Sequence, residues 1–127
     1  MHRKSLTPLG ETEMEVLHHV WELEHATVAQ VHDRILKTRK VAYTTIMTVM
    51  KKLADKGYLK YDKDGATYVY RPAQTKGEVQ QGLLDNLVEK AFNGSPAALI
   101  QTLVKHESLS NEELDDIRKL IEDLEDR

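Results

Sequence analysis

Apolar residues recur at helical spacing three times in the first half of the chain. Residues three and four positions apart lie on one face of an α-helix, so each such set predicts a helix with one buried side. The sets are Met14, Leu17, Val20 and Trp21; then Val28, Val31 and Ile35; then Ile46, Val49, Met50 and Leu53. The expected helices span residues 10–12 to 23, 27 to about 37, and 43 to 56. Trp21 should be a core anchor of the first helix.

Capping signals are clear at some of these helix ends and weak at others. Thr27 and Gln30 form a capping box, in which each side chain accepts a hydrogen bond from the other residue's backbone N–H. Gly57 suits the left-handed position that follows a helix. Ala42, at the expected start of the third helix, is a poor cap because its side chain has no acceptor. Either Thr44 or the preceding loop must then supply the acceptor.

After Gly57 the apolar pattern changes to the alternation of β-strands. Residues 58–62 and 67–70 are the expected strands, and the segment 63–66 between them holds an Asp-Gly turn signal. We therefore expect a hairpin at residues 59–70, with Lys63 in its loop, Lys60 just before that loop, and Arg71-Pro72 closing it. Because its tyrosines alternate, some should face the core and others the surface.

The polar side of the third helix has a composition that suits DNA. Hydroxyl side chains stand in its first turns and lysines one turn later, as in a helix that touches base edges first and phosphates afterwards. This side carries Thr44, Thr48, Lys51 and Asp55, flanked by Thr45, Met47 and Lys52. The alternative is an ordinary amphipathic helix with a solvated polar face. Similarly, Tyr43 either packs on sugar and phosphate or covers the core, and His32 contacts either phosphate or the core.

The order of three helices followed by a hairpin tips this balance. It predicts an α+β chain, mainly α, that begins with a winged helix-turn-helix DNA-binding domain at residues 1–73. The third helix would enter the major groove, and the hairpin would be the wing, whose lysines displace counterions from the phosphate backbone.

Residues 74–127 predict three more amphipathic helices. The first runs from Lys76 to Phe92, the second is capped by Ser95 and opens with Pro96, and a capping box of Ser110 and Glu113 starts the third. Three helices of this size have little room to bury all their apolar stripes against one another, so we expect a helical dimerisation region. The alternative is a monomer in which they fold back on the winged domain. The expected dimerisation residues are Leu83, Leu87, Phe92, Leu99, Leu103, Leu114, Ile117, Leu120, Ile121 and Leu124.

The net charge of −3 conceals two unlike halves. Residues 1–73 hold 12 Lys and Arg against 9 Asp and Glu, a net of +3, whereas residues 74–127 hold 6 against 12, a net of −6. The excess is sharpest between Arg34 and Lys63, where nine cations stand against only Asp55 and Asp62. This distribution predicts one basic face on the first domain.

Several classes of function are disfavoured. The chain has no cysteine, and its six histidines lack a matching set of carboxylates, so we expect neither a metal site nor a cofactor. We find no catalytic triad, phosphate loop or paired-carboxylate motif and expect no enzyme activity. Without an apolar leader or a run of about 18 apolar residues, the protein should be cytoplasmic with no membrane insertion.

Four segments resemble the penicillinase-repressor family of the BlaI/MecI type. They are LGETEMEVLHHVW at residues 9–21, VAYTTIMTVMKKLADKG at 41–57, DGATYVYR at 64–71 and SNEELDDIRKLIEDL at 110–124. The resemblance covers nearly the whole chain, and the AYTTIMTV run is its most specific part.

This resemblance implies a homodimeric transcriptional repressor that binds a palindromic DNA operator. It places Thr44, Thr45, Met47 and Thr48 at base contacts; backbone contacts are expected from Tyr43, Lys51, Lys52, Lys60 and Lys63. Met47 replaces a longer polar or cationic residue of better-known members, which implies a different operator sequence. In founding members a sensor-activated protease cleaves an Asn-Phe pair, and Thr102-Leu103 is the aligned pair here. The rival interpretation is a winged-helix protein-interaction module without sequence-specific DNA binding.

Overall fold

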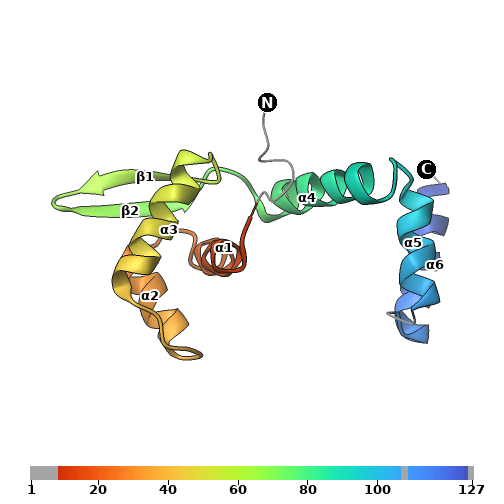
Figure 1. Cartoon of the computed structure of the whole chain (residues 1–127), viewed down its shortest axis with the longest axis horizontal. Helices are drawn as coiled ribbons and strands as arrows, with labels where there is room; N and C mark the ends of the chain where they lie inside the picture. The colour runs from red at the N-terminus through yellow and green to blue at the C-terminus, as the bar shows by residue number, and fades with distance from the viewer. Residues whose placement is uncertain (1–8, 107–108, 126–127) are drawn as a thin grey trace. The chain divides into compact units, whose positions relative to one another are not determined.

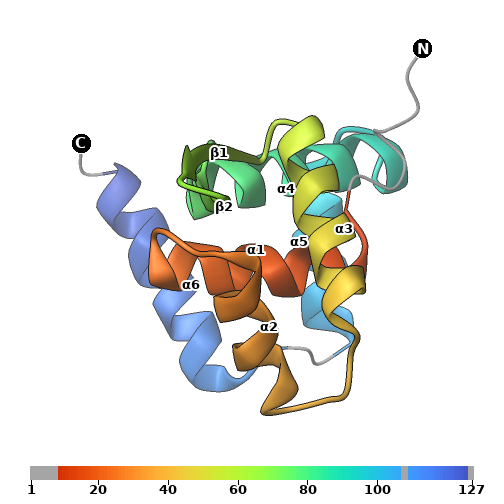
Figure 2. The ribbon, with the colours of Figure 1, turned by 90° about the vertical axis from the view of Figure 1, so that its left-hand side faces the viewer.

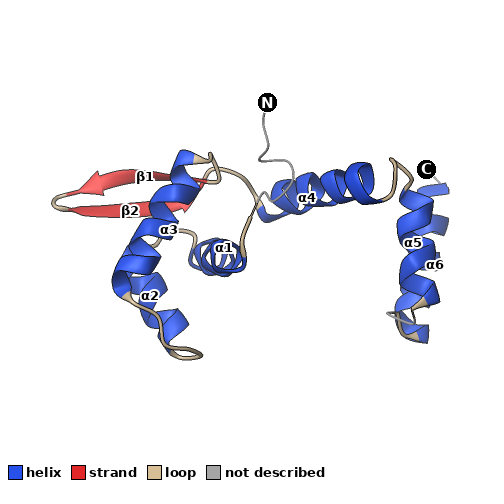
Figure 3. Ribbon diagram, viewed as in Figure 1, coloured by secondary structure: helices blue, strands red, loops and turns tan. Residues whose placement is uncertain are grey.

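The computed structural model describes residues 9–106 and 109–125 and contains six helices and one two-stranded sheet in that part of the chain (Figure 1, Figure 3). The chain separates into two units, Met1–Leu84 and Asp85–Arg127. The elements are α1 (Glu11–Leu23), α2 (Val28–Leu36), α3 (Tyr43–Asp55), β1 (Leu59–Asp64), β2 (Thr67–Pro72), α4 (Lys76–Ala91), α5 (Pro96–Lys105) and α6 (Asn111–Glu125). The expected mainly helical α+β class and the winged helix-turn-helix are confirmed.

The core of the first unit is built from the three predicted stripes. Within the first unit, α1 lies between α2 and the hairpin and contacts both (Figure 1, Figure 2). Nearly every stripe residue is buried or packs against the buried cluster, and Leu59 and Tyr70 join it from the hairpin. The largest fully buried side chains are those of Val16, Leu17, Val20, Val31, Ile35, Ile46, Met50 and Leu53. These side chains fix the side of α3 that faces inward and therefore the side that remains outside.

Trp21 is less of an anchor than we expected. Its ring is only partly buried against the core, and its indole N–H donates to the carbonyl of Gln74 at 3.1 Å. Val16, which the sequence pattern did not select, is fully buried instead. Trp21 thus ties α1 to the segment that follows the hairpin, since a large ring with a polar edge is well suited to a half-buried position.

The predicted side-chain caps are present at the starts of α2, α5 and α6, whereas the start of α3 has no such cap among the described residues. Thr27 and Gln30 make the reciprocal capping bonds, Ser95 accepts from the N–H of Ala98, and Ser110 pairs with Glu113. At the start of α3 the N-cap is Ala42, and no side chain caps it. Thr44 therefore does not supply the missing acceptor, and among the described residues no side chain accepts from the first N–H groups of α3.

The hairpin is longer than its sequence pattern suggested. β1 continues through Lys63 to Asp64, and β2 continues through Arg71 to Pro72. The expected loop at 63–66 was too long, because only Gly65 and Ala66 remain between the paired ends Asp64 and Thr67. Gly65 has φ +65°, a value that glycine adopts without strain, which allows a two-residue connection. Lys63 is consequently a strand residue whose direction is set by the register.

The base of the hairpin is fastened to the loop between α1 and α2. Ala26, fully buried in that loop, donates its N–H to the carbonyl of Tyr70 and accepts the N–H of Tyr70, both at 2.8 Å. These two bonds add a single β-bridge beside β2. The root of the hairpin is therefore held by backbone bonds on both sides.

The helices after the hairpin bury little apolar surface. In α4 only Val79 is buried, and in α5 and the described part of α6 no side chain is. The exposed fractions reach 46% for Leu87, 46% for Ile100 and 62% for Leu120. The side chain of Leu124 lies outside the described residues, and none of the other expected dimerisation residues is buried. Α single copy thus leaves these apolar stripes open to water.

Candidate nucleic-acid interface

The polar side of α3 is exposed along its whole length. Thr44, Thr45, Met47 and Thr48 are all exposed, as are Lys51 and Lys52 one turn later. Met47 has 45% of its surface accessible, whereas Met50, three residues further on, has none. Because the inward stripe of α3 is fixed by the core, the structure holds this threonine-and-lysine face outward.

A cleft separates this face of α3 from the hairpin. Its volume is about 430 Å³. It is lined by Met47, Thr48, Lys51, Tyr61, Tyr68 and Tyr70. The second half of the predicted contact face and one face of the hairpin therefore border the same space. The sequence pattern did not reveal this cleft, because tyrosine alternation alone does not say what a strand faces.

The register places the two hairpin lysines on opposite faces. Successive strand residues point to opposite sides, so Lys63 shares its face with Tyr61 and with its cross-strand partner Tyr68. The Lys63 ammonium lies 5.9 Å from the centre of the Tyr68 ring. By the same register, Lys60 lies on the opposite face of the hairpin. The structure thus brings Lys63, but not Lys60, to the side of the hairpin that faces α3.

Some of the nine cations at residues 34–63 form ion pairs with acidic side chains of α1. Arg34 forms an ion pair with Glu22 and donates through Nε to Nδ1 of His19 at 3.0 Å. Arg39 binds Glu15 at 2.7 Å. The basic excess that the sequence indicated is therefore partly structural, since these arginines join α1 to α2 and the loop that follows it.

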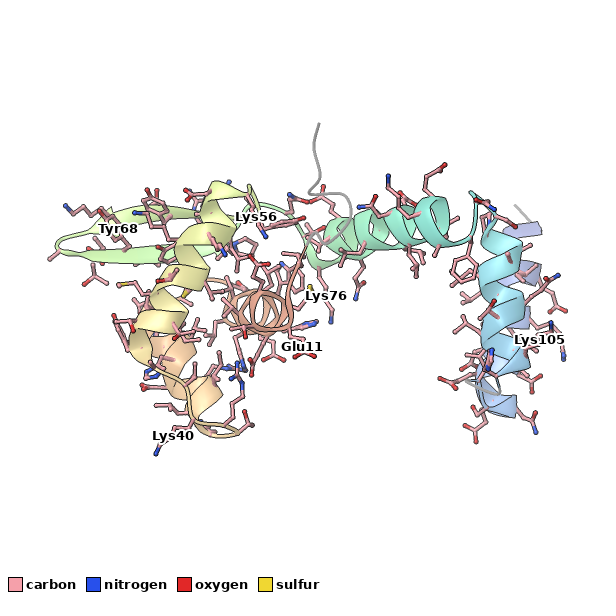
Figure 4. All side chains as sticks on the ribbon, viewed as in Figure 1. Glu11, Lys40, Lys56, Tyr68, Lys76 and Lys105 are labelled. Carbon is pink, nitrogen blue, oxygen red and sulfur yellow. The ribbon has the colours of Figure 1, made fainter. Side chains whose placement is uncertain are left out.

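Six lysines of this stretch have no ion pair within residues 9–106 and 109–125. They are Lys37, Lys40, Lys51, Lys52, Lys60 and Lys63. Lys37 and Lys40 lie between α2 and α3, just ahead of the exposed threonines (Figure 4 labels Lys40). We did not single them out from the sequence, although the basic run at 37–40 was a signal for them.

His32 positions the start of α3. Its Nε2 lies 2.7 Å from the carbonyl oxygen of Val41, and its ring packs edge-on against Tyr43 with centroids 5.6 Å apart. Of the two roles expected for His32, the structure shows contact with the protein. Tyr43 keeps 46% of its surface exposed and does not cover the core. This pair fixes the end of the loop at which α3 begins.

The other end of α3 is fixed by an ion pair that the sequence did not reveal. Glu13 in α1, only 9% exposed, accepts from the Lys56 ammonium at 2.9 and 3.0 Å and from the Gly10 N–H at 2.8 Å. Burial disfavours the charged form of Glu13, but the Gly10 N–H and the Lys56 ammonium together outweigh it. They hold the pKa of Glu13 below its ordinary value of 4.5.

This lowered pKa predicts a loss of stability in acid. Because the folded protein binds the Glu13 proton less readily than the unfolded chain, the pair stabilises the fold fully above pH 4.5, and this contribution is lost as pH falls through the folded-state pKa. We expect Glu13→Gln to lower the free energy of unfolding by about 1–2 kcal/mol at neutral pH and by less in acid. Urea unfolding at a series of pH values measures both. The control is Glu15→Gln, which breaks only the more exposed Arg39 pair. Equal pH dependence of Glu13→Gln and the unchanged protein would contradict this role.

Within the described part of the chain, no three His, Asp or Glu side chains come together as a metal site would require. Over the same residues, none of the helices combines the length and the apolar character needed to cross a bilayer.

Comparison with known proteins gives consistent matches, and the sequence matches cover nearly the whole chain. The family model described as penicillinase repressor matches residues 9–123. The transcriptional regulator BlaI of Mycobacterium tuberculosis is 35% identical over 122 residues, covering 94% of this chain and 87% of that protein. The penicillinase repressor of Bacillus licheniformis is 23% identical over 124 residues, covering 98% and 97%. The solved DNA-binding domain of the repressor BlaI has a TM-score of 0.52 and 26% identity, covering 61% of this chain and 93% of that one.

Proposed function

This chain belongs to the penicillinase repressor family, and from that premise we propose that it is a homodimeric repressor that covers a palindromic DNA operator. Residues 1–73 bind DNA and residues 74–127 form the dimer. The observation that carries the proposal is the exposed threonine-and-lysine face of α3, which borders the cleft beside the hairpin. A bound repressor blocks RNA polymerase by occupying its site.

The contacts divide by chemistry. Thr44, Thr45 and Thr48 offer short hydroxyls that reach base edges in the major groove, and the thioether of Met47 offers an apolar surface to a thymine methyl group. An apolar side chain at this position reads a different base from a cationic one, so the operator differs from those of relatives that carry a cation there.

Backbone contacts surround this reading surface. Tyr43, Lys51 and Lys52 flank the threonines on α3, while Lys60 and Lys63 stand on the hairpin. The missing side-chain cap at Ala42 fits this arrangement, because the free N–H groups at the start of a helix attract a phosphate oxygen. A position that breaks the capping rule is thus one where DNA would supply the acceptor.

Threonine and lysine variants should weaken binding in different ways. We expect Thr45→Ala or Thr48→Ala to reduce discrimination between operator and random DNA by about 1–3 kcal/mol, the usual value of a base contact. Lys51→Gln, Lys52→Gln or Lys63→Gln should weaken binding to both DNAs and lower the salt dependence by about one counterion each. Mobility shifts at two or more salt concentrations measure both quantities.

Lys60→Gln is the matched comparison for Lys63→Gln, because both lysines are proposed backbone contacts but their side chains leave opposite faces of one strand. A smaller change in salt dependence is expected for Lys60. Equal losses on operator and random DNA for the threonine variants would refute the division of roles, and no shift at low salt would refute DNA binding itself.

The dimer follows from the apolar surface left open in residues 74–127. Exposed leucines and isoleucines on successive helical turns, such as Leu120 and Ile121 at 62% and 49%, cost free energy in water unless a partner covers them. A second copy offers the same stripes in a two-fold arrangement, which also presents two reading helices to two half-sites.

Relief of repression by a sensor-activated protease is part of the proposal, with Thr102-Leu103 as the cleavage pair. Thr102 is exposed on α5, and its hydroxyl donates to the carbonyl of Ala98 at 2.9 Å within the helix. A protease must open this turn before cutting it. Because α5 has no buried side chain in a single copy, local opening costs less there than in the core of the first unit.

A further inference from the structure

We propose that the cleft between α3 and the hairpin is a binding site for a planar aromatic anion, and that an occupant of this site excludes operator DNA. The exclusion rests on the proposed function, whereas the binding itself does not. The site lies wholly within the first unit, between the second half of α3 and the face of the hairpin that carries the tyrosines.

The walls of the cleft select a flat, apolar molecule. Tyr61 stands edge-on to Tyr68, with ring centroids 5.1 Å apart and planes at 75°, and it is tilted by 51° against Tyr70 at 5.4 Å. These rings present both faces and edges to the space, and the flexible thioether of Met47 closes the side opposite them. The volume of about 430 Å³ is in the range of small-molecule sites.

The charge of the cleft selects an anion. Lys51 is the one charged residue in the lining, no carboxylate lines the cleft, and Lys51 has no ion pair within the described residues. Lys63, over the Tyr68 ring, adds positive charge at the outer end. Although tyrosine faces attract cations, two ammonium groups at this site oppose a cationic guest. A carboxylate on an aromatic ring satisfies both the walls and the charge.

Occupancy would act on DNA binding through shared residues. Met47 and Thr48 are proposed base contacts and Lys51 a proposed phosphate contact, so a molecule seated against all three covers part of the reading surface. Two ligands that need the same side chains compete, and each lowers the apparent affinity for the other. The site would thus make repression sensitive to aromatic anions.

The binding test adds 2-naphthoate to the full chain, and the fluorescence of 2-naphthoate itself reports binding. Two matched probes separate the features of the site: 2-naphthamide keeps the ring system without the charge, and cyclohexanecarboxylate keeps the charge without the aromatic ring. Isothermal titration compares all three. We expect 2-naphthoate to bind more tightly than either, and equal binding of naphthoate and naphthamide would overturn the choice of an anion.

Variants locate the site. Tyr61 and Tyr68 are about half exposed, at 49% and 46%, so Tyr61→Ser and Tyr68→Ser remove cleft walls without opening the core. Each should weaken 2-naphthoate binding by about 3–10-fold, and Lys51→Gln by about 2–5-fold. Leu36→Ser and Lys76→Gln, which remove an exposed apolar side chain and a lysine outside the cleft, should leave it unchanged. Binding that survives all three cleft variants would overturn the site.

The exclusion test adds 2-naphthoate to the chain bound to its operator. We expect a fall in operator affinity that Tyr68→Ser abolishes. Binding to the cleft with unchanged operator affinity would overturn the exclusion. If the chain binds no DNA at all, the proposed function fails, while direct titration of 2-naphthoate still decides whether the site exists.

Discussion

Met50→Ala is expected to lower the free energy of unfolding by about 2–5 kcal/mol, a large part of the stability of a domain of this size. Met50 is fully buried in the stripe of α3 that packs against α1 and α2. Truncating it leaves a cavity beneath the contact helix, and the surrounding side chains relax only in part. Operator binding should fall with the folded fraction. Urea unfolding followed by circular dichroism measures the stability change.

The control for this prediction is on the same helix. Met47→Ala makes the same chemical change three residues earlier, but Met47 is 45% exposed and lies outside the core. We expect little change in unfolding free energy and an altered preference among operator sequences. If Met47→Ala destabilised the protein as much as Met50→Ala, the inward and outward sides of α3 would have to be exchanged.

Leu120→Glu is expected to dissociate the dimer. Leu120 keeps 62% of its surface exposed in a single copy, and the proposed partner covers it. A carboxylate buried there without a partner should raise the dimer dissociation constant by on the order of 100-fold or more. Sedimentation velocity at micromolar concentration then reports a monomer. Operator affinity should drop towards that of one half-site, because two linked heads bind far more tightly than one.

Lys119→Gln is the matched control, since it also lowers the net charge by one but lies beside the apolar stripe and not on it. It should remain a dimer. A monomeric unchanged protein, or a dimer that survives Leu120→Glu, would contradict the assignment of residues 74–127 to dimerisation. The winged part should unfold at the same urea concentration in both variants, because its core is separate.

Much of the first unit could be predicted from sequence because local pattern and final packing agree there. Val28, Val31 and Ile35 are buried, as their helical spacing predicted, and the polar side of α3 is exposed. The Asp-Gly turn signal correctly predicted that a hairpin is present. For the helices a single physical cause, burial of one face, decides both the spacing of the apolar residues and the structure.

What sequence could not show depends on pairs of residues distant in the chain. The bond between Glu13 and Lys56 joins positions 43 apart, and neither residue stands out alone. Likewise, the basic run suggested unpaired cations, yet Arg34 and Arg39 form ion pairs with glutamates of α1. The cleft beside α3 needs the strand register, which shifts every tyrosine to the other face if it slips by one residue.

The β-bridge between Ala26 and Tyr70 determines which part of the hairpin can change in length. Both backbone bonds hold the hairpin near its base. The part of the hairpin between Tyr68 and the turn at Gly65 therefore extends beyond this bridge. Residues added in cross-strand pairs at that turn would lengthen the arm and leave the core untouched. The length of this arm can therefore diversify independently of α3, the helix that we propose reads the bases.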